Sequence, residues 1–334
     1  MKKIKYSVLD LSMITRDGTA ATAIQRTVDL AQKAEELGYE RIWLAEHHNM
    51  EFVASSATSV LIGHIGAKTK NIRIGSGGIM LPNHAPLAIA EQFGTLETLY
   101  PGRIDLGLGR APGTDQQTAI ALRRGDLNTA YQFPKDVIAL QHFFSAANKT
   151  ASVRAFPGEG LDIPIWILGS STDSAYLAAE MGLPYAFASH FAPKQFQYAL
   201  QIYRHNFQPS QYLDKPYVLA CVNGIAADTN EAAELLSMSL YQLFSGILTN
   251  ARKPLSPPVP NLLESWPPEL IEAVNGMTAC TFVGDKDTLI RDFSRFIEES
   301  QVDEIMIAGN IFDGGKRLKS YQILAEVFDA INQS

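Results

Sequence analysis

The sequence predicts a single (β/α)₈ TIM barrel of the α/β class, with an insertion before its eighth strand. Short β-branched runs alternate with helix-length amphipathic segments almost from end to end, as βαβ units with a buried parallel sheet require. Eight such pairs fit in 334 residues. An open sheet would normally have fewer strands and would leave exposed edges, so a closed barrel is favoured. We therefore expect one domain over residues 1–334.

The elements follow from the periodicity of the apolar residues. Strands are expected at residues 5–12, 39–46, 71–78, 102–109, 163–168, 184–189, 216–226 and 302–309. Helices are expected at residues 19–38, 54–68, 86–99, 116–145, 171–182, 192–207, 228–249 and 315–331. Gly38 is expected to end the first helix.

One interval interrupts this alternation. Residues 250–280 carry six prolines and are too long for an ordinary connection. Long connections on the active-site side of a barrel are often lids, so these residues are a candidate lid over the barrel mouth. A surface insertion or an oligomer contact is the alternative.

Composition excludes several classes of partner and location. A formal net charge of −7, without a basic cluster, argues against nucleic acid and anionic membranes and favours a small-molecule ligand. The apolar run at the N-terminus is too short for a signal peptide or a membrane span, so a cytoplasmic protein is expected. Cys221 and Cys280 are far apart and predict neither a disulfide nor a zinc finger.

Candidate chemistry lies at the carboxyl ends of the strands, where barrel active sites are built. The run WLAEHH places Glu46, His47 and His48 after the second strand. Adjacent residues at a strand end face opposite sides, so the two imidazoles are poorly placed to share a metal and no metal site is predicted. His47 is the candidate for proton transfer or for stabilising an oxyanion, and a capping or loop role is the alternative, more so for His48.

Glycines and one arginine mark the ends of the third and fourth strands. Gly77 and Gly78 allow a flat ligand to approach the backbone closely, or form a simple bulge. The glycines of LGLGRAPG are spaced GxGxxxG, and Pro112 interrupts the turn, so a dinucleotide-binding motif is rejected. Arg110 then remains as a fixed cation suited to a phosphate.

The strongest signal for an anion is ILGSSTDSAYLAAEMGLP after the fifth strand. Here a strand leads through a glycine into a helix whose first turn offers hydroxyls, free N–H groups and the positive end of the helix dipole. Ordinary capping without a ligand is the alternative. The candidate phosphate-binding residues are Gly169, Ser170, Ser171 and Ser174.

These strand-end motifs resemble the bacterial luciferase-like flavin monooxygenases. The likeness rests on WLAEHH, on IRIGSGGIMLPNHAPLAIAEQFGTLETLYPGRIDLGLGRAPG and on PIWILGSSTDSAYLAAEMGLP, in that order. It implies that His47 matches the catalytic histidine and that Arg110, Ser171 and Ser174 match residues at the flavin phosphate. It also implies a cis peptide between Gly77 and Gly78 against the isoalloxazine ring. Gly109 stands where luciferase has a reactive cysteine, which puts light emission in doubt.

The resemblance implies an FMN-dependent monooxygenase that uses reduced FMN (FMNH₂) and O₂ to oxidise a small organic substrate through a flavin peroxide. A separate flavin reductase is expected as a partner, and a homo-oligomer is expected. Three alternatives stay open. They are a reductase or dehydrogenase of the same fold that uses the deazaflavin F420, a non-catalytic flavin-binding protein, and a metal-dependent hydrolase that uses the histidines.

Overall fold

The computed structural model describes residues 3–123 and 129–333, and within them the chain forms a parallel (β/α)₈ barrel. The barrel strands are β1 (Lys5–Asp10), β2 (Arg41–Leu44), β3 (Arg73–Met80), β4 (Ile104–Gly109), β5 (Ile165–Gly169), β6 (Tyr185–Phe187), β7 (Val218–Ala226) and β9 (Glu304–Ala308). Pairing of β6 with β7 and of β9 with both β7 and β1 closes the ring. The predicted fold class is confirmed.

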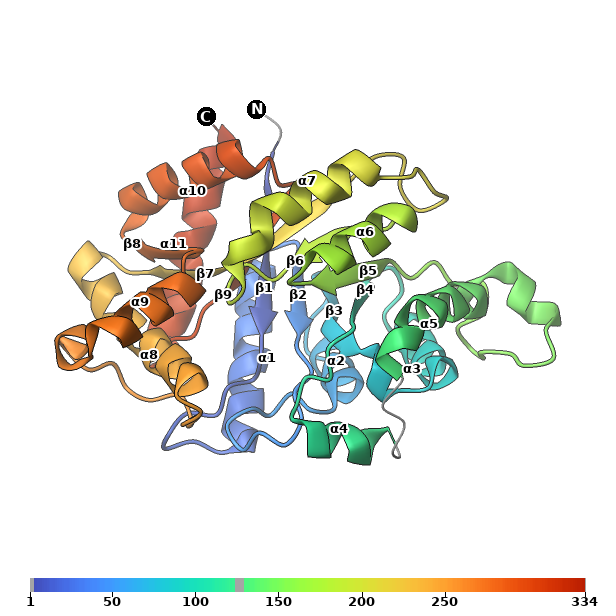
Figure 1. Ribbon diagram of the computed structural model, residues 1–334, viewed down its shortest axis with the longest axis horizontal. Helices are drawn as coiled ribbons and strands as arrows, with labels where there is room; N and C mark the ends of the chain where they lie inside the picture. Colours follow the sequence, from blue (N-terminus) through green and yellow to red (C-terminus); the bar gives the residue numbers. More distant parts are fainter. Residues whose placement is uncertain (1–2, 124–128, 334) are drawn as a thin grey trace.

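Helices surround this ring, most of them against its outer face, and α4 lies beyond the ends of the strands (Figure 1). They are α1 (Ala20–Glu36), α2 (Thr58–Gly66), α3 (Pro86–Leu99), α4 (Gln116–Leu122), α5 (Thr129–Phe144), α6 (Thr172–Glu180), α7 (Phe196–Asn206), α8 (Asn230–Leu248), α9 (Pro268–Met277), α10 (Lys286–Ser300) and α11 (Gly314–Gln333). Side chains at several N-caps fix where these helices begin, as Thr19 does for α1 and Thr229 for α8.

Two parts of the predicted element list are wrong. The single helix predicted over 116–145 is two helices, since α4 ends at Leu122 and α5 begins at Thr129; residues 124–128 of that prediction lie outside the described residues. Residues 281–301, to which no element was assigned, form a strand, β8 (Thr281–Gly284), and α10. β8 lies outside the ring and pairs with the carboxyl-terminal half of β7.

The barrel interior is filled by a compact apolar cluster. Trp43, Trp166 and Met306 lie there with inward-facing residues of the other strands, and the two indoles meet edge to face at 5.1 Å between ring centroids. A larger cluster between the strands and the outer helices forms the main core. The interior is therefore packed below the mouth, which leaves the carboxyl ends of the strands for binding.

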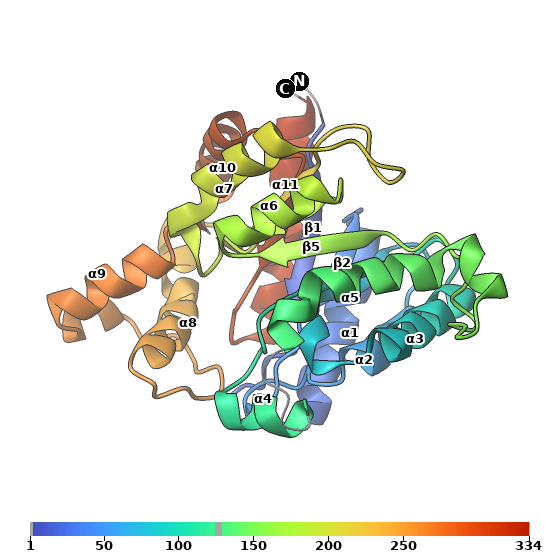
Figure 2. The same ribbon diagram turned by 45° about the vertical axis from the view of Figure 1, so that its right-hand side comes forward.

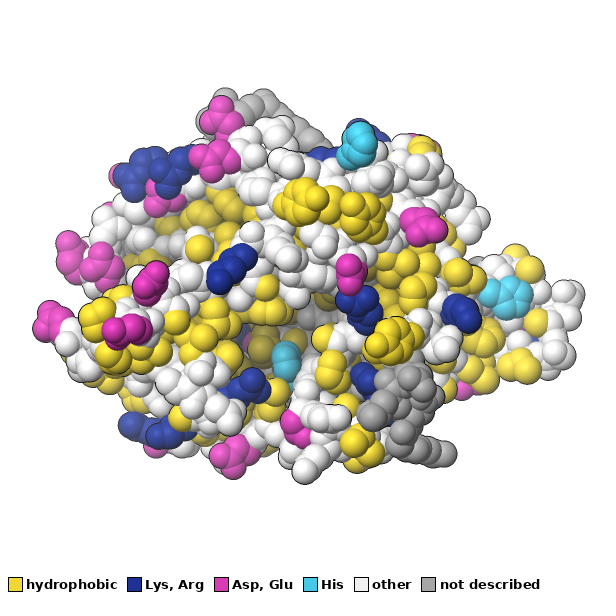
Figure 3. All heavy atoms as spheres, viewed as in Figure 1, with side chains coloured by type: hydrophobic (Ala, Val, Ile, Leu, Met, Phe, Trp, Pro, Cys, Tyr) yellow, Lys and Arg dark blue, Asp and Glu magenta, His cyan; other side chains and the backbone are white. Residues whose placement is uncertain are grey.

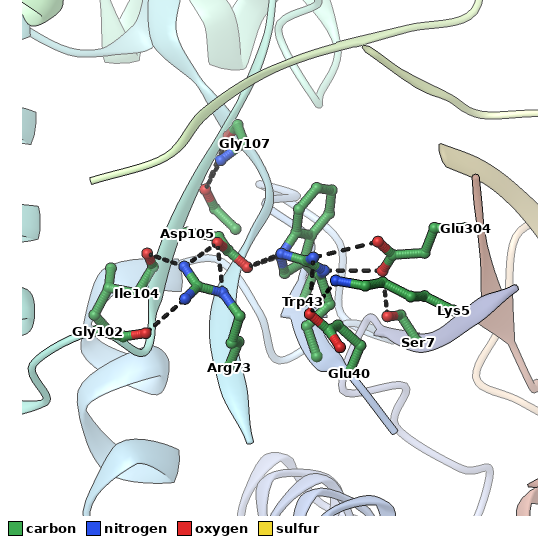
Figure 4. A network of polar contacts seen from close by, with 12 residues as sticks. Lys5, Ser7, Glu40, Trp43, Arg73, Gly102, Ile104, Asp105, Gly107 and Glu304 are labelled. Atoms are coloured by element: carbon green, nitrogen blue, oxygen red, sulfur yellow. Dashed lines mark hydrogen bonds and ion pairs between the residues drawn. The ribbon is translucent and has the colours of Figure 1, made fainter. Parts of the chain in front are cut away.

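A buried ionic network closes the amino end of the barrel (Figure 4). Arg41 at the start of β2 pairs with Asp105 of β4 (Nη1 to Oδ2, 2.6 Å) and with Glu304 of β9 (Nε to Oε1, 2.8 Å). Arg73 also binds Asp105, and the Ser7 hydroxyl donates to Glu304. Removal of one partner would leave an uncompensated buried charge and would destabilise the fold. We therefore assign this network a structural role at the amino end of the barrel.

The long interval after α8 lies at the carboxyl end of the barrel. Leu255 forms backbone hydrogen bonds in both directions with the loop after β1, from Leu255 N to Ile14 O and from Arg16 N to Leu255 O, each at 2.9 Å. Leu255 itself is 3% exposed. Figures 1 and 2 show α8 and α9 next to each other, on the side of the molecule away from α3 and α5. The interval is thus on the side of the strand ends, as a lid requires.

Candidate active site

Backbone and side-chain hydrogen bonds join the loops after β1, β2 and β4 at the barrel mouth. Met13 and Val53 form an isolated bridge between the first two loops. The Thr114 hydroxyl donates to the carbonyl oxygen of His48 at 2.9 Å, which joins the second loop to the loop after β4. These contacts hold the segment containing EHH in a fixed position at the strand ends.

Glu46 is a buried carboxylate that hydrogen-bonds to several residues around the barrel mouth. Its carboxylate is 1% exposed and accepts hydrogen bonds from Nε2 of His48 at 2.8 Å and from Nε2 of His84 at 2.9 Å. The backbone N–H of Met80 donates to the second carboxylate oxygen at 3.0 Å. Burial would raise the pKa of Glu46, but these hydrogen bonds and the charge of His84 lower it to about 2. Glu46 is therefore a structural anion at neutral pH.

His47 has a different environment from its neighbours. Its side chain is half-buried, and Nδ1 is buried without a hydrogen-bond partner among the described residues. Burial lowers the pKa of His47 to about 4, with His48 and Arg252 adding to the effect and Glu46 opposing it. The imidazole is therefore neutral at neutral pH and has a ring nitrogen free for a ligand.

His190 follows β6 and is near enough to His47 to be affected electrostatically by it. Its Nδ1 is also buried without a partner in the described chain, and burial together with His47 lowers its pKa to about 3. On the face of the molecule seen in Figure 3, a histidine side chain lies at the floor of a hollow with Lys or Arg side chains at its edge. Arg252 is near enough to His47 to lower its pKa, so a cation accompanies these neutral imidazoles.

The third strand carries the predicted glycine pair to the same mouth. The Gly77–Gly78 peptide is cis, so this expectation is confirmed. A Cβ at Gly77 would come within 2.8 Å of the Leu9 side chain and 3.0 Å of Trp43. Gly77 is nevertheless partly exposed, so its backbone is open to a flat ligand at this point.

Arg110 and the first turn of α6 come together as the sequence predicted. Arg110 Nη2 lies 3.1 Å from Asp173 Oδ2, with both side chains largely exposed. Ser171 is the N-cap residue of α6, and its hydroxyl makes no cap hydrogen bond. The first-turn N–H groups of this helix are therefore not satisfied by the cap side chain, which contradicts ordinary serine capping at Ser171.

Ser174 and Gly169 have a clear local role. The Ser174 hydroxyl donates to the Ser171 carbonyl oxygen at 2.7 Å and lies 3.0 Å from the Tyr185 hydroxyl. A Cβ at residue 169 would fall 1.8 Å from that Ser174 oxygen, so only glycine leaves room for the serine. The pair shapes the strand-to-helix turn, and Ser174 reaches its partners inside the protein.

Ser170 is exposed and lines a cavity of about 370 Å³ between the β5 end and α9. The same cavity is lined by Lys194, Phe191 and Met277. Lys194 adds a cation to the neighbourhood of the α6 N-terminus. Sequence reasoning missed this lysine because it lies seven residues beyond the end of β6, in the turn Pro193–Gln195.

Glu46 follows the second predicted strand, but its sequence position alone predicts neither its role nor its pairing with His84. The signal was present, since a carboxylate directly after an apolar strand is buried only when it is paired.

Within residues 3–123 and 129–333, no group of three or more His, Cys, Asp or Glu side chains is arranged to hold a metal ion. No helix of the described chain is long and apolar enough to cross a membrane.

The family is settled by comparison with known proteins. The family model described as luciferase-like monooxygenase matches residues 4–304. The chain belongs to this family. Its relatives include a luciferase-like monooxygenase of Escherichia coli K12, 50% identical over 98% of this chain and 97% of the relative. An N-acetyl-S-alkylcysteine monooxygenase of Bacillus subtilis 168 is 33% identical over 97% of this chain and 98% of its own length.

Solved structures of similar proteins share the fold over almost the full length. Apo-MsnO8 is 30% identical with a TM-score of 0.87, covering 98% of each chain. Two more distant structures, each 14% identical, show likeness of fold alone. They are the oxygenating constituent of 3,6-diketocamphane monooxygenase from Pseudomonas putida in complex with FMN (TM-score 0.75, 98% of each chain) and an F420-dependent secondary alcohol dehydrogenase (TM-score 0.70, 99% of each chain). Membership of the luciferase-like family makes the chain an oxidoreductase of monooxygenase type.

Proposed function

We propose that this chain is the oxygenase component of a two-component, FMN-dependent monooxygenase. The observation that carries the proposal is the meeting of Arg110 with the uncapped N-terminus of α6, beside the strand ends that hold Gly77–Gly78 and His47. An anion at a helix N-terminus with an arginine beside it fits a phosphate. The chain's membership of the luciferase-like monooxygenase family supports a flavin phosphate.

The residues fit FMN in three respects. Arg110 and Ser171, with the turn through Gly169 and Ser170, would hold the phosphate. Ser174, predicted as a further phosphate ligand, would instead shape that turn, because its hydroxyl already donates to the Ser171 carbonyl oxygen. Gly77 and Gly78 would lie against the isoalloxazine ring. His47 would be the catalytic group, because its buried Nδ1 has no partner in the described structure and a ligand atom can supply one.

Reduced FMN, when bound, supplies the electrons with which O₂ is activated. The chain's own residues position and shield that chemistry. Neutral His47 can accept or donate a hydrogen bond at the reacting atoms. Glu46 joins the loops after β2 and β3 through hydrogen bonds with His48 and His84. Because His47 lies between Glu46 and His48 in the chain, these contacts fix its position.

A separate reductase would provide reduced FMN. The Pseudomonas putida structure of the same fold is described as an oxygenating constituent, which is the arrangement proposed here. The substrate is a small organic molecule, and the Bacillus subtilis relative is named for N-acetylated thioethers. We also expect a cytoplasmic homo-oligomer, which fractionation and sedimentation velocity would test.

The experiment compares cofactors and then follows oxygen. Purified protein is titrated with FMN, riboflavin and F420, and protein loaded with reduced FMN is mixed with ¹⁸O₂ and a panel of thioethers and ketones. We expect binding of FMN in preference to the other two, and transfer of one ¹⁸O atom to a product.

Two results would refute the proposal. Binding and turnover of F420 with no binding of FMN would assign the chain to the deazaflavin-dependent oxidoreductases of this fold. Tight FMN binding without any oxygen transfer across the panel, and without an effect of His47→Ala on oxidation of the reduced flavin, would indicate a non-catalytic flavin-binding protein.

A further inference from the structure

A cavity of about 370 Å³ opens beside the residue that precedes the N-cap of α6. Ser170 forms part of its wall, and the next residue, Ser171, is the N-cap whose hydroxyl makes no cap hydrogen bond. The other walls come from residues 191–195 after β6 and from the end of α9. That end of α9 contacts the turn Pro193–Gln195, which precedes α7 (Figures 1 and 2). The cavity therefore adjoins the proposed phosphate site on the side of α7 and α9.

Lys194 gives this cavity a cation without a partner. Among the described residues that line the cavity, Lys194 is the one charged side chain. Its ammonium group makes no ion pair or hydrogen bond with a described residue, whereas Arg110 pairs with Asp173 at 3.1 Å between Nη2 and Oδ2. An ammonium group binds a phosphate as a point charge. The cavity can thus hold a negative charge in addition to the phosphate proposed at α6.

The same cavity has an apolar wall that is open to a ligand. The Phe191 side chain is 42% exposed, and its ring meets the His190 ring edge to face with centroids 4.7 Å apart. Met277 lines the cavity as well and contributes a polarisable thioether. Flat rings, purine bases among them, pack well on aromatic and thioether side chains. The cavity therefore suits a ligand that carries both an anionic group and a flat ring.

Gly276 keeps one side of the cavity open. A Cβ at this position of α9 would meet no heavy atom within 4 Å, and the φ of Gly276 is not in the left-handed region. The backbone there accepts a larger residue, so the glycine is not required by a turn or by close packing. The space beside it is available to a ligand and can be removed by substitution.

We propose that this cavity holds the adenosine monophosphate half of a flavin adenine dinucleotide, so that the site accepts FAD as well as FMN. The inference rests on the proposed function for the position of the phosphate that the two flavins share. The second phosphate of FAD would lie at Lys194, and its purine ring would pack on Phe191. The acidic tail of F420 would use Lys194 but has no flat ring for Phe191, so the dinucleotide fits both features. A volume of about 370 Å³ also falls within the range of about 300–1,000 Å³ usual for small-molecule sites.

The test compares oxidised FMN and FAD by calorimetry on the full chain. In the wild type, we expect the Kd for FAD to lie within about threefold of that for FMN, because the ordering of the longer ligand offsets its added contacts. Gly276→Leu should weaken FAD binding about tenfold or more and leave FMN binding unchanged, because its side chain takes the space of the purine. Lys194→Ala should weaken FAD binding about tenfold and FMN binding less, since the charge at the second phosphate is lost.

Controls separate the cavity from general effects of charge and helix content. Lys215→Ala removes an exposed lysine in the loop before β7, and Gly315→Leu adds leucine at an exposed glycine of α11. Neither residue lines the cavity, so both variants should keep the wild-type ratio of the two Kd values. Gly276→Val is the second variant if Gly276→Leu does not fold. Far-UV circular dichroism and the Kd for FMN report the state of each protein.

Three results would overturn the assignment. They are FMN binding without FAD binding in the wild type, equal losses of FMN and FAD affinity in Gly276→Leu, and FAD affinity that is unchanged in both Gly276→Leu and Lys194→Ala. Tighter binding of F420 than of FAD, lost in Lys194→Ala, would assign the cavity to an acidic tail instead. Binding of FAD without FMN would refute the proposed cofactor and leave the cavity assignment standing, and failure to bind either flavin would refute the proposed phosphate site itself.

Discussion

Glu46 Oε1 lies 2.9 Å from His84 Nε2, and this contact joins the end of β2 to the turn that follows β3. The two residues are 38 positions apart in the chain, yet one buried carboxylate fixes the relation between the loops that carry His47 and the glycine pair. The site geometry therefore depends on a residue that we do not place in contact with the reacting atoms.

Glu46→Gln should destabilise the protein and reduce its sensitivity to acid. The pKa of Glu46 is lowered from 4.5 to about 2, so the unfolded state binds the proton first as pH falls. The stabilisation is present above about pH 4.5 and is lost as pH falls toward 2, with a magnitude of about 3 kcal/mol. Urea unfolding at several pH values measures it.

Glu36→Gln is the matched control, because the Glu36 carboxylate is 66% exposed at the end of α1. It should leave both the free energy of unfolding and its pH dependence near the wild-type values. If the free energy of unfolding depended on pH in the same way in the wild type and in Glu46→Gln, the Glu46 carboxylate would not be the cause of that dependence.

The imidazoles of His47 and His190 should remain neutral between pH 5.5 and 8. Burial lowers their pKa values to about 4 and about 3, so each protonates in the native state only well below the usual midpoint near 6.5. Since the unfolded histidines take up protons first, these groups also make the fold less stable as pH falls below about 6.5. Histidine-selective NMR would detect the titrations, and a midpoint near 6.5 for either residue would contradict the burial argument.

His47→Ala should leave FMN affinity within a few-fold of wild type while uncoupling turnover. Loss of an acid–base group typically costs about 10²–10⁴ in rate, and O₂ would then appear as hydrogen peroxide instead of product. Product and hydrogen peroxide are measured in the same reaction. His48→Ala is the comparison. Because His48 binds Glu46, it should lower stability and keep coupling. The reverse pattern would transfer the catalytic role to His48.

Arg110→Ala should weaken FMN binding more than tenfold and leave riboflavin binding unchanged, since a charge-assisted hydrogen bond contributes about 1.5–3 kcal/mol. Asp173→Ala should tighten FMN binding a few-fold, because it removes the carboxylate 3.1 Å from the arginine. Fluorescence titration gives all the constants. Equal affinity of the wild type for riboflavin and FMN would exclude the phosphate site.

Periodicity predicted the parts of the fold that bury a continuous apolar strand. All eight barrel strands lie where alternating runs placed them, because each is buried on both faces. β8 was missed because it lies outside the ring, where its first three residues are only half-buried. α10 was not predicted, although Asp285 caps it and its apolar residues recur at helical spacing.

The sequence places His47, Arg110 and Ser171 directly after strands, and the structure places them there too, whereas their roles stay predictions. The structural role of Glu46 was not predicted, because it depends on a partner far along the chain, His84. Sequence spacing does not report which strand ends face one another. Closure of the barrel decides that.

Residues 250–280 should behave as a lid anchored at one point. Leu255 is fixed to the loop after β1, whereas the chain around it encloses a cavity of about 280 Å³ against α8 that is lined by Trp266 and Lys253. The anchor holds the segment at the mouth, and the loose packing beside it allows movement. Trypsin should cut after exposed Arg252 in the free protein, and FMN should protect that bond. Leu255→Ala should speed cleavage and raise hydrogen peroxide release with FMN affinity unchanged, while Val259→Ala, at a side chain that is 45% exposed, should do neither. Cleavage that ignores FMN, together with unchanged coupling in Leu255→Ala, would make the segment a surface insertion.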